Sequence, residues 1–296
     1  MKIPANSDLT HAAPQRSLRE RGFSLIELAV VLVIVATAIT AFLAVLTPQL
    51  AMVSYRQTST QLAEVSDAIV AFAMVNRRLP CPATAASAGQ EAFCTNATGA
   101  CGAVVFVAPA SGRGRCAAAQ NASFVPAATL GIGGLRPIDN LLPDAWAYPI
   151  RYVTNTVTNV GTNNPDVGLG CAAGANTCYP FTQIDGLWNA YYNPTVAPTS
   201  TLFVCASATG INAVNCNTAT PLSNPAFVVY STGANGTGTL AVADVDELAN
   251  INADSVFVSH DKTEPGAANG AFDDLFRWVT VPQLLQKMSA NGVFSP

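Results

Sequence analysis

The sequence predicts an α+β protein in which a long N-terminal helix, first transmembrane and then amphipathic, packs on an antiparallel or mixed β-sheet head with disulfide-bonded loops. Three observations carry this prediction. A long uncharged apolar stretch follows a basic N-terminus, short apolar runs separated by turn residues fill the rest of the chain, and all eight cysteines lie after residue 80. Half of the 296 residues are hydrophobic and 11% are charged, which excludes a highly charged disordered chain.

The N-terminus combines a basic leader, residues 1–22, with an apolar run from Phe23 to Leu46. Between Glu27 and Arg56, 28 consecutive residues carry no charge, which exceeds the roughly 20 residues that a helix needs to cross a bilayer. The excess of positive charge before the run predicts a cytoplasmic N-terminus. We therefore expect a single pass through the inner membrane, followed by a periplasmic head.

Glu27 is the one charged residue inside this run. It lies about 6 Å along a helix from Phe23, and a carboxylate in a span costs on the order of 2.5–3.5 kcal/mol at the bilayer centre. Such a residue predicts a function and a cationic partner. The alternative is that Glu27 extends back to the lipid headgroups.

The segment Arg21-Gly22-Phe23-Ser24-Leu25-Ile26-Glu27 resembles the prepilin junction of type IV pilins and type II secretion pseudopilins. That junction is a basic leader ending in Gly, then an aromatic residue, and a glutamate at the fifth position of the mature chain. The resemblance implies that prepilin peptidase cuts between Gly22 and Phe23 and N-methylates Phe23. It also implies that Glu27 pairs with the α-amine of a neighbouring subunit. The implied partners are other pilins or pseudopilins, an inner-membrane assembly platform and lipid.

The predicted helix has two parts, a transmembrane and filament-core part at residues 23–53 and an amphipathic part at 54–78. An apolar face recurs at helical spacing along the second part, at Leu62, Val65, Ile69 and Phe72. Pro48 is predicted to kink the helix, and Pro80 and Pro82 to prevent its continuation.

Residues 79–296 are predicted to form the head. Strands are expected at short apolar runs, namely 104–107, 149–153, 202–205, 227–230 and 256–258. The block Asp144-Ala145-Trp146-Ala147-Tyr148-Pro149 resembles the Asp-x-Trp-Gly-x-Pro block of pseudopilin heads, with Ala147 in place of Gly. Residues 228–236, 272–275 and 282–288 resemble a strand and turn, a closing strand and a terminal helix of the same heads.

The cysteines are predicted to form disulfides, because all of them lie beyond the span, no CxxC pair is present and the chain holds only two histidines. Two local pairs are expected, Cys171–Cys178 and Cys205–Cys216. The remaining four would pair among themselves in one of three connectivities, and they are Cys81, Cys94, Cys101 and Cys116.

One oxygen-rich cluster in the head offers the ligands that calcium prefers, at Asp244, Asp246, Asn250, Asn252 and Asp254. Some pseudopilin heads bind calcium in a C-terminal loop, so the resemblance makes this cluster a candidate site. The alternative is a helix capped by Asp244 and followed by a polar loop. No other cofactor is expected.

The resemblance implies a structural subunit and not an enzyme, and the size of the head favours a minor pilin or pseudopilin. The alternative is a membrane-tethered periplasmic binding protein or enzyme that does not assemble. His260 next to Asp261 has no accompanying Gly-x-Ser-x-Gly motif. With 14 Lys+Arg against 18 Asp+Glu, no nucleic-acid partner is predicted.

Overall fold

The computed structural model describes residues 24–96, 101–106, 114–119, 122–155, 181–192, 200–236 and 244–294. The chain forms two compact units, Met1–Ala51 and Met52–Pro296. The first contains the start of helix α1 (Leu25–Asn76), and the second contains the end of that helix and the whole head. The α+β class predicted from the sequence is confirmed.

Helix α1 runs through Pro48 without interruption and ends at Asn76. The next residue, Arg77, has a left-handed φ of 55°, and its N–H donates to the carbonyl of Ala73 at 2.8 Å. A left-handed residue after the last turn is a common helix terminator. The chain then turns away before Pro80, which could not continue the helix.

The main sheet of the head has the strand order β3-β6-β8, formed by Arg151–Thr154, Pro225–Ser231 and Leu275–Thr280. Both pairings are antiparallel, and Val228 lies opposite Val153 on one side and Trp278 on the other. Every residue of the central strand β6 is buried. Because successive side chains point to opposite faces, β6 contributes to a core on each side of the sheet.

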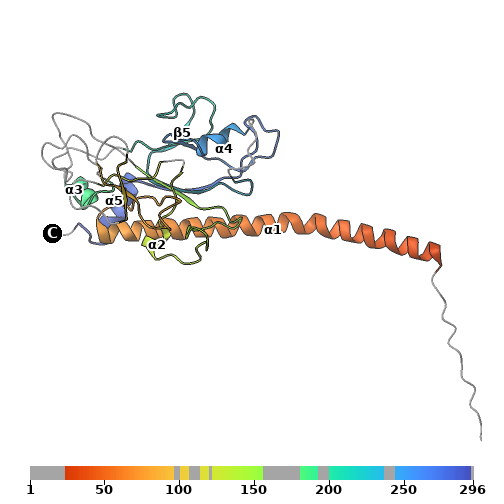
Figure 1. Cartoon of the computed structure of the whole chain (residues 1–296). Coiled ribbons are helices and arrows are strands. Elements are labelled where there is room, and N and C mark those ends of the chain that lie inside the picture. Colours follow the sequence, from red (N-terminus) through yellow and green to blue (C-terminus); the bar gives the residue numbers. More distant parts are fainter. Residues whose placement is uncertain are drawn as a thin grey trace, which may run out of the picture. The chain divides into compact units, whose positions relative to one another are not determined.

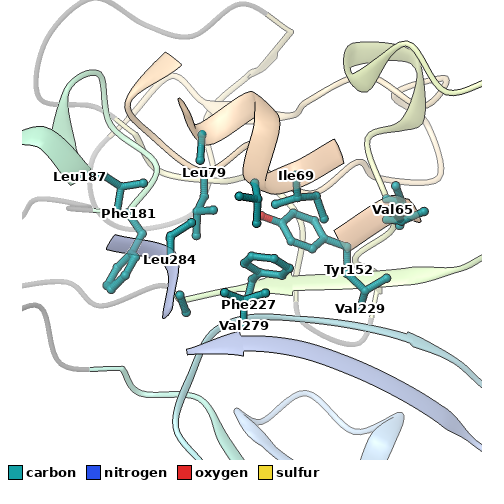
Figure 2. Packing of buried hydrophobic residues seen from close by; sticks show 14 of the residues in the cluster. Val65, Ile69, Leu79, Tyr152, Phe181, Leu187, Phe227, Val229, Val279 and Leu284 are labelled. Carbon is teal, nitrogen blue, oxygen red and sulfur yellow. The ribbon is translucent and has the colours of Figure 1, made fainter. Parts of the chain in front are cut away.

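The core between the sheet and α1 contains Phe227 and Val229 of β6 with Tyr152 of β3. Figure 2 shows Val65 and Ile69 of α1 directed at these side chains. The apolar face predicted for the second part of the helix is therefore the face that packs on the head. The opposite face of β6 presents Val228 and Tyr230 to a second core.

A second sheet, β5-β4-β7, consists of Pro221–Ser223, Phe203–Cys205 and Val256–Val258. Strand β4 pairs antiparallel with β5 and parallel with β7, so the predicted mixed character is present. Val204 and Phe257 of this sheet supply the other side of the second core. A small hairpin joins β1 (Phe93–Cys94) to β2 (Val104–Val105).

Four short helices complete the described part of the head (Figure 1), α2 (Ala127–Leu130), α3 (Gly186–Tyr192), α4 (Val245–Asn250) and α5 (Val281–Ala290). Helix α5 is the predicted terminal helix. It begins with a capping box, in which the Thr280 hydroxyl accepts from the Gln283 N–H and the Gln283 side chain accepts from the Thr280 N–H. Reciprocal capping of this kind fixes where a helix starts.

Three disulfides are present in the described residues, Cys81–Cys116, Cys94–Cys101 and Cys205–Cys216. The last is one of the two local pairs expected from the sequence, and the first two give the connectivity that the sequence left open. Cys171 and Cys178, the other expected pair, lie outside the described residues.

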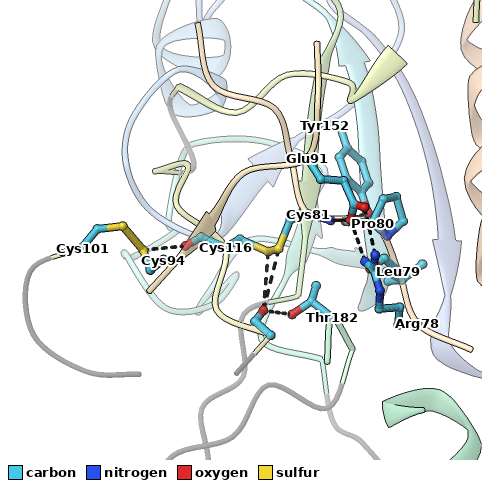
Figure 3. Close-up of a disulfide and its surroundings, with 11 residues drawn as sticks. Arg78, Leu79, Pro80, Cys81, Glu91, Cys94, Cys101, Cys116, Tyr152 and Thr182 are labelled. Atoms are coloured by element: carbon cyan, nitrogen blue, oxygen red, sulfur yellow. Dashed lines mark hydrogen bonds and ion pairs between the residues drawn. A yellow bond between two sulfur atoms is a disulfide. The ribbon is translucent and has the colours of Figure 1, made fainter. Parts of the chain in front are cut away.

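The Cys81–Cys116 disulfide lies beside a buried ion pair (Figure 3). Arg78 donates two hydrogen bonds to the Glu91 carboxylate, at 2.6 and 2.9 Å, and the Cys81 N–H donates to the same carboxylate at 2.7 Å. The Tyr152 hydroxyl donates to the Pro80 carbonyl at 2.9 Å. The Tyr152 hydrogen bond joins the segment that leaves α1 to strand β3, and the bonds to Glu91 join the same segment to the residues that precede β1.

Candidate functional site

The N-terminal candidate site is the apolar start of α1, residues Leu25–Phe42. This stretch of 18 residues has a mean hydropathy of 2.6, and none of it is buried within the structure. Leu25, for example, is 88% exposed. A helix that is apolar on all sides and not covered by protein requires lipid or other apolar helices around it.

Ser24 and Glu27 form a capping box at the first turn of this helix. The Glu27 N–H donates to the Ser24 hydroxyl oxygen at 3.2 Å, and the Ser24 N–H donates to the Glu27 carboxylate at 3.2 Å. The Ser24 hydroxyl also lies 3.3 Å from that carboxylate. The Glu27 carboxylate therefore satisfies one otherwise free backbone N–H group at the helix start, that of Ser24, where a negative charge is also favoured by the helix dipole.

Sequence reasoning missed this box, although the Ser-x-x-Glu spacing was its signal. The finding changes how Glu27 is interpreted. In the single chain its carboxylate has local donors, but all of them are neutral. Gly22 and Phe23, the predicted cleavage and methylation residues, lie outside the described residues.

The other polar side chains of the span, Thr37 and Thr40, are satisfied within the helix. The Thr37 hydroxyl lies 3.0 Å from the Val33 carbonyl, and the Thr40 hydroxyl lies 3.1 Å from the Ala36 carbonyl. Neither threonine requires a partner outside its own helix. Glu27 is the charged residue of the described span, and none of the ion pairs in the described residues includes it.

In the head, the five residues of the predicted oxygen-rich cluster belong to separate hydrogen-bond networks. Asp244 is the N-terminal flanking residue of α4, but its carboxylate accepts from the Ala271 N–H and makes no capping bond. Asn252 and Asp254 bond to each other within one turn. Asn250 bonds to the backbone of Val258 on the neighbouring strand.

Asp246 joins three further segments of the head. One carboxylate oxygen accepts from the Ala208 N–H at 2.5 Å and from the Asn269 side chain at 3.2 Å. The other oxygen lies 3.0 Å from the His260 ring. The Ser207 hydroxyl contacts Asp246, not His260, so these residues do not form the serine–histidine pair that nucleophilic catalysis requires.

The structure instead gathers three other carboxylates, Glu247, Asp273 and Asp274, with ligand oxygens all within 4.8 Å of one another. Glu247 is 1% exposed and Asp274 is 8% exposed. Burial raises the pKa of Glu247 and Asp273, and together with their charges it raises the pKa of Asp274 well above its ordinary value. Carboxylate oxygens in such a group are ligands that a hard cation accepts.

No sequence pattern predicts this grouping, because Asp273 and Asp274 precede β8 whereas Glu247 lies on α4. Each carboxylate already accepts a hydrogen bond: Glu247 from the Asn235 side chain at 2.6 Å, Asp273 from the Ala234 N–H at 3.0 Å and Asp274 from the Asn250 side chain at 2.7 Å. The group therefore links α4 to the start of β8.

The first part of the chain also matches a known family model. The model describes the prokaryotic N-terminal methylation motif and matches residues 17–43. No curated protein and no solved structure matches the chain. The matched residues include the Gly22–Phe23 junction, the Ser24–Glu27 capping box and the exposed apolar stretch, so they contain the whole N-terminal candidate site.

Proposed function

We propose that this chain, whose residues 17–43 match the prokaryotic N-terminal methylation motif, is a minor pilin or pseudopilin, a structural subunit of a type IV pilus or a type II secretion filament. One observation carries the proposal. The start of α1 is an uncovered apolar helix of 18 residues, and it begins with a single carboxylate that has no cation beside it. Such a helix lies in the lipid bilayer before assembly and packs against other helices of its kind in the filament.

Processing creates the missing cation. Prepilin peptidase removes residues 1–22 and methylates the new N-terminus at Phe23. The α-amine left at Phe23 carries a positive charge, and Glu27 follows one helical turn later. Each charge is poorly solvated beside lipid, so pairing the Glu27 carboxylate with the amine of a neighbouring subunit offsets part of both penalties.

The membrane topology follows from the same segment. The basic leader stays on the cytoplasmic side and the head, residues 79–296, lies in the periplasm. The three disulfides support this location, because disulfides persist in oxidising compartments. The assembly platform of the inner membrane then moves the subunit from the bilayer into the filament. The large head favours incorporation in few copies.

Replacing Glu27 tests the proposal. In cells that produce the filament, Glu27→Ala should be cleaved and methylated like the wild type, as shown by intact mass, but should be largely absent from the sheared filament fraction. Ser24→Ala is the matched control, because it removes the capping partner and keeps the carboxylate. We expect Ser24→Ala to be incorporated.

Two results would contradict this function. One is retention of residues 1–22 in the presence of the peptidase. The other is incorporation of Glu27→Ala at the wild-type level. A tethered periplasmic protein that does not assemble would be indifferent to the Glu27 substitution.

A further inference from the structure

Strand β8 is an edge of the main sheet, and its outer side has no backbone partner in the described residues. The sheet order is β3-β6-β8, and β8 pairs with β6 alone. The opposite edge, β3, is bridged by Phe124. The edge strands of the second sheet, β5 and β7, have three residues each, whereas β8 has six. Strand β8 is therefore the longest unpaired edge in the described part of the head.

The composition of β8 favours pairing with a further strand. Its sequence is Leu-Phe-Arg-Trp-Val-Thr, which is rich in the aromatic and β-branched residues that strands prefer and contains no proline. Every residue of β8 except Val279 is at least partly exposed. Every second residue of an edge strand directs its N–H and C=O groups away from the sheet, and these groups form a template for another extended chain.

A cleft of about 380 Å³ is lined by residues of β8, α1 and α5, and three hydrogen-bond donors contribute to its lining. Ser66 of α1 is 8% exposed, and its hydroxyl makes no hydrogen bond within the described part of the chain. The Gln283 side-chain carbonyl accepts from the Thr280 N–H at 3.0 Å, which leaves its NH2 group to donate. The third donor is the guanidinium of Arg277, which is exposed.

The charges of this cleft favour an anionic side chain. Lys287 lies 3.6 Å from Asp67, so these two charges offset each other. No ion pair of the described residues includes Arg277, which leaves the cleft with a net positive charge. A carboxylate accepts hydrogen bonds from hydroxyl, amide and guanidinium donors and makes its strongest bonds to the guanidinium. The donors and the charge of the cleft therefore both fit a carboxylate.

We propose that the β8 edge binds an extended, acidic segment of a different protein by β-strand addition. The backbone of that segment pairs with β8, and one of its carboxylates enters the cleft beside Arg277. In this mode of recognition the backbone bonds supply affinity and the side-chain pocket supplies specificity. A second copy of the chain fits less well, because joining two β8 edges brings two Arg277 side chains together. The inference goes beyond filament assembly, since all the groups that it uses lie within the unit Met52–Pro296.

Synthetic peptides test the proposal with the purified full chain in detergent. The probe is a labelled peptide of alternating threonine and valine with one central glutamate, equal in length to β8. One comparison peptide has lysine in place of the glutamate, and another has the probe sequence with every amide nitrogen methylated. Fluorescence anisotropy should show binding of the glutamate peptide, about fivefold weaker binding of the lysine peptide and no binding of the methylated peptide, which lacks backbone donors.

Charge reversal in the protein supplies the matched measurement. Arg277→Glu should weaken binding of the glutamate peptide by about fivefold and should reverse the preference between the glutamate and lysine peptides. Arg56→Glu is the control, because it makes the same change of charge at an exposed position of α1 that does not line the cleft. Hydrogen exchange locates the contact: the bound glutamate peptide should slow exchange at β8 by about tenfold and leave β5 unchanged.

Several results would overturn the proposal. Equal binding of the methylated peptide, or no slowing of exchange at β8, excludes strand addition at this edge. Equal binding of the glutamate and lysine peptides excludes an acidic partner. Slow exchange at β8 that increases with the concentration of the chain alone identifies a second copy as the occupant. None of these measurements depends on filament assembly, so their failure is distinct from failure of the proposed function.

Discussion

At Ala147 the backbone adopts a left-handed conformation, with φ of 68°. The Asp144 carboxylate holds this turn by accepting from the N–H groups of Trp146 and Tyr148, both at 2.9 Å. The similar block of pseudopilin heads has glycine at this position. A residue with a Cβ is strained there, whereas glycine is not. The turn therefore forms despite the strain at Ala147, because the two hydrogen bonds to the Asp144 carboxylate offset that strain.

Ala147→Gly should accordingly stabilise the head by about 0.5–1 kcal/mol, the relief of strain exceeding the added entropy of the unfolded chain. Urea unfolding of the detergent-solubilised protein measures the change. Ala71→Gly, on the exposed side of α1, is the same chemical change in a regular helix and should cost about 1 kcal/mol. Destabilisation by both variants would show that the turn at Ala147 is not strained.

Arg78 and Glu91 form an ion pair inside the head. Both side chains are buried, and Arg78 also lies over the Phe72 and Phe93 rings at 4.9 and 5.3 Å. Glu91→Ala leaves the guanidinium buried without its anion, so it should cost about 3–5 kcal/mol in urea unfolding.

Two controls separate charge burial from lost packing. The double variant Arg78→Met/Glu91→Leu should lose less stability than Glu91→Ala, because no unpaired charge remains. Glu264→Ala breaks an exposed pair and should cost less than about 1 kcal/mol. A double variant that is less stable than Glu91→Ala would contradict this account.

At the scale of elements, α4 and β8 are joined by carboxylates that repel one another. Asp274 receives a hydrogen bond from Asn250 of α4, and Glu247 of α4 accepts from the Asp273 N–H at 2.7 Å. These bonds position the two elements, but burial penalises the ionised carboxylates. Since the pKa of Asp274 is raised in the folded protein, its contribution to stability is complete below about pH 4, the ordinary Asp value. It is lost as the pH rises through the folded-state value.

Asp274→Asn should therefore be more stable than the wild type at neutral pH, because the amide oxygen still accepts from Asn250 and carries no charge. The stability difference between variant and wild type should grow from about pH 4 upward. Urea unfolding at a series of pH values measures it. Asp261→Asn, an exposed change outside the carboxylate group, is the control. A difference that is independent of pH would show that Asp274 is not penalised by its charge.

At the scale of the whole molecule, the two units differ in whether their apolar side chains are exposed or buried. In the first unit, the apolar stretch Leu25–Phe42 is not buried, whereas the second unit has its own cores, beginning on α1 at Leu62. Because the buried contacts of the head lie within Met52–Pro296, this unit contains what it needs to fold.

A chain of residues 52–296 should thus be soluble without detergent and unfold within about 1 kcal/mol of the full chain, or about 2–4 °C in Tm. A chain of residues 79–296 is the control. It lacks Val65 and Ile69, which fill the core against the main sheet, and should not fold cooperatively. Equal stability of the two truncated chains would show that α1 is dispensable for the head.

The sequence by itself determined the span, the processing motif, most strand positions and the Cys205–Cys216 pair. These features depend on residues close together in the chain, so hydropathy, charge and spacing are sufficient to predict them. Only the tertiary structure decided that Cys81 pairs with Cys116, and that Glu247 meets Asp273 and Asp274. It also decided that β6 is buried on both faces. Those contacts join residues far apart in the chain, and they depend on how sheets and helices pack, which local patterns do not encode.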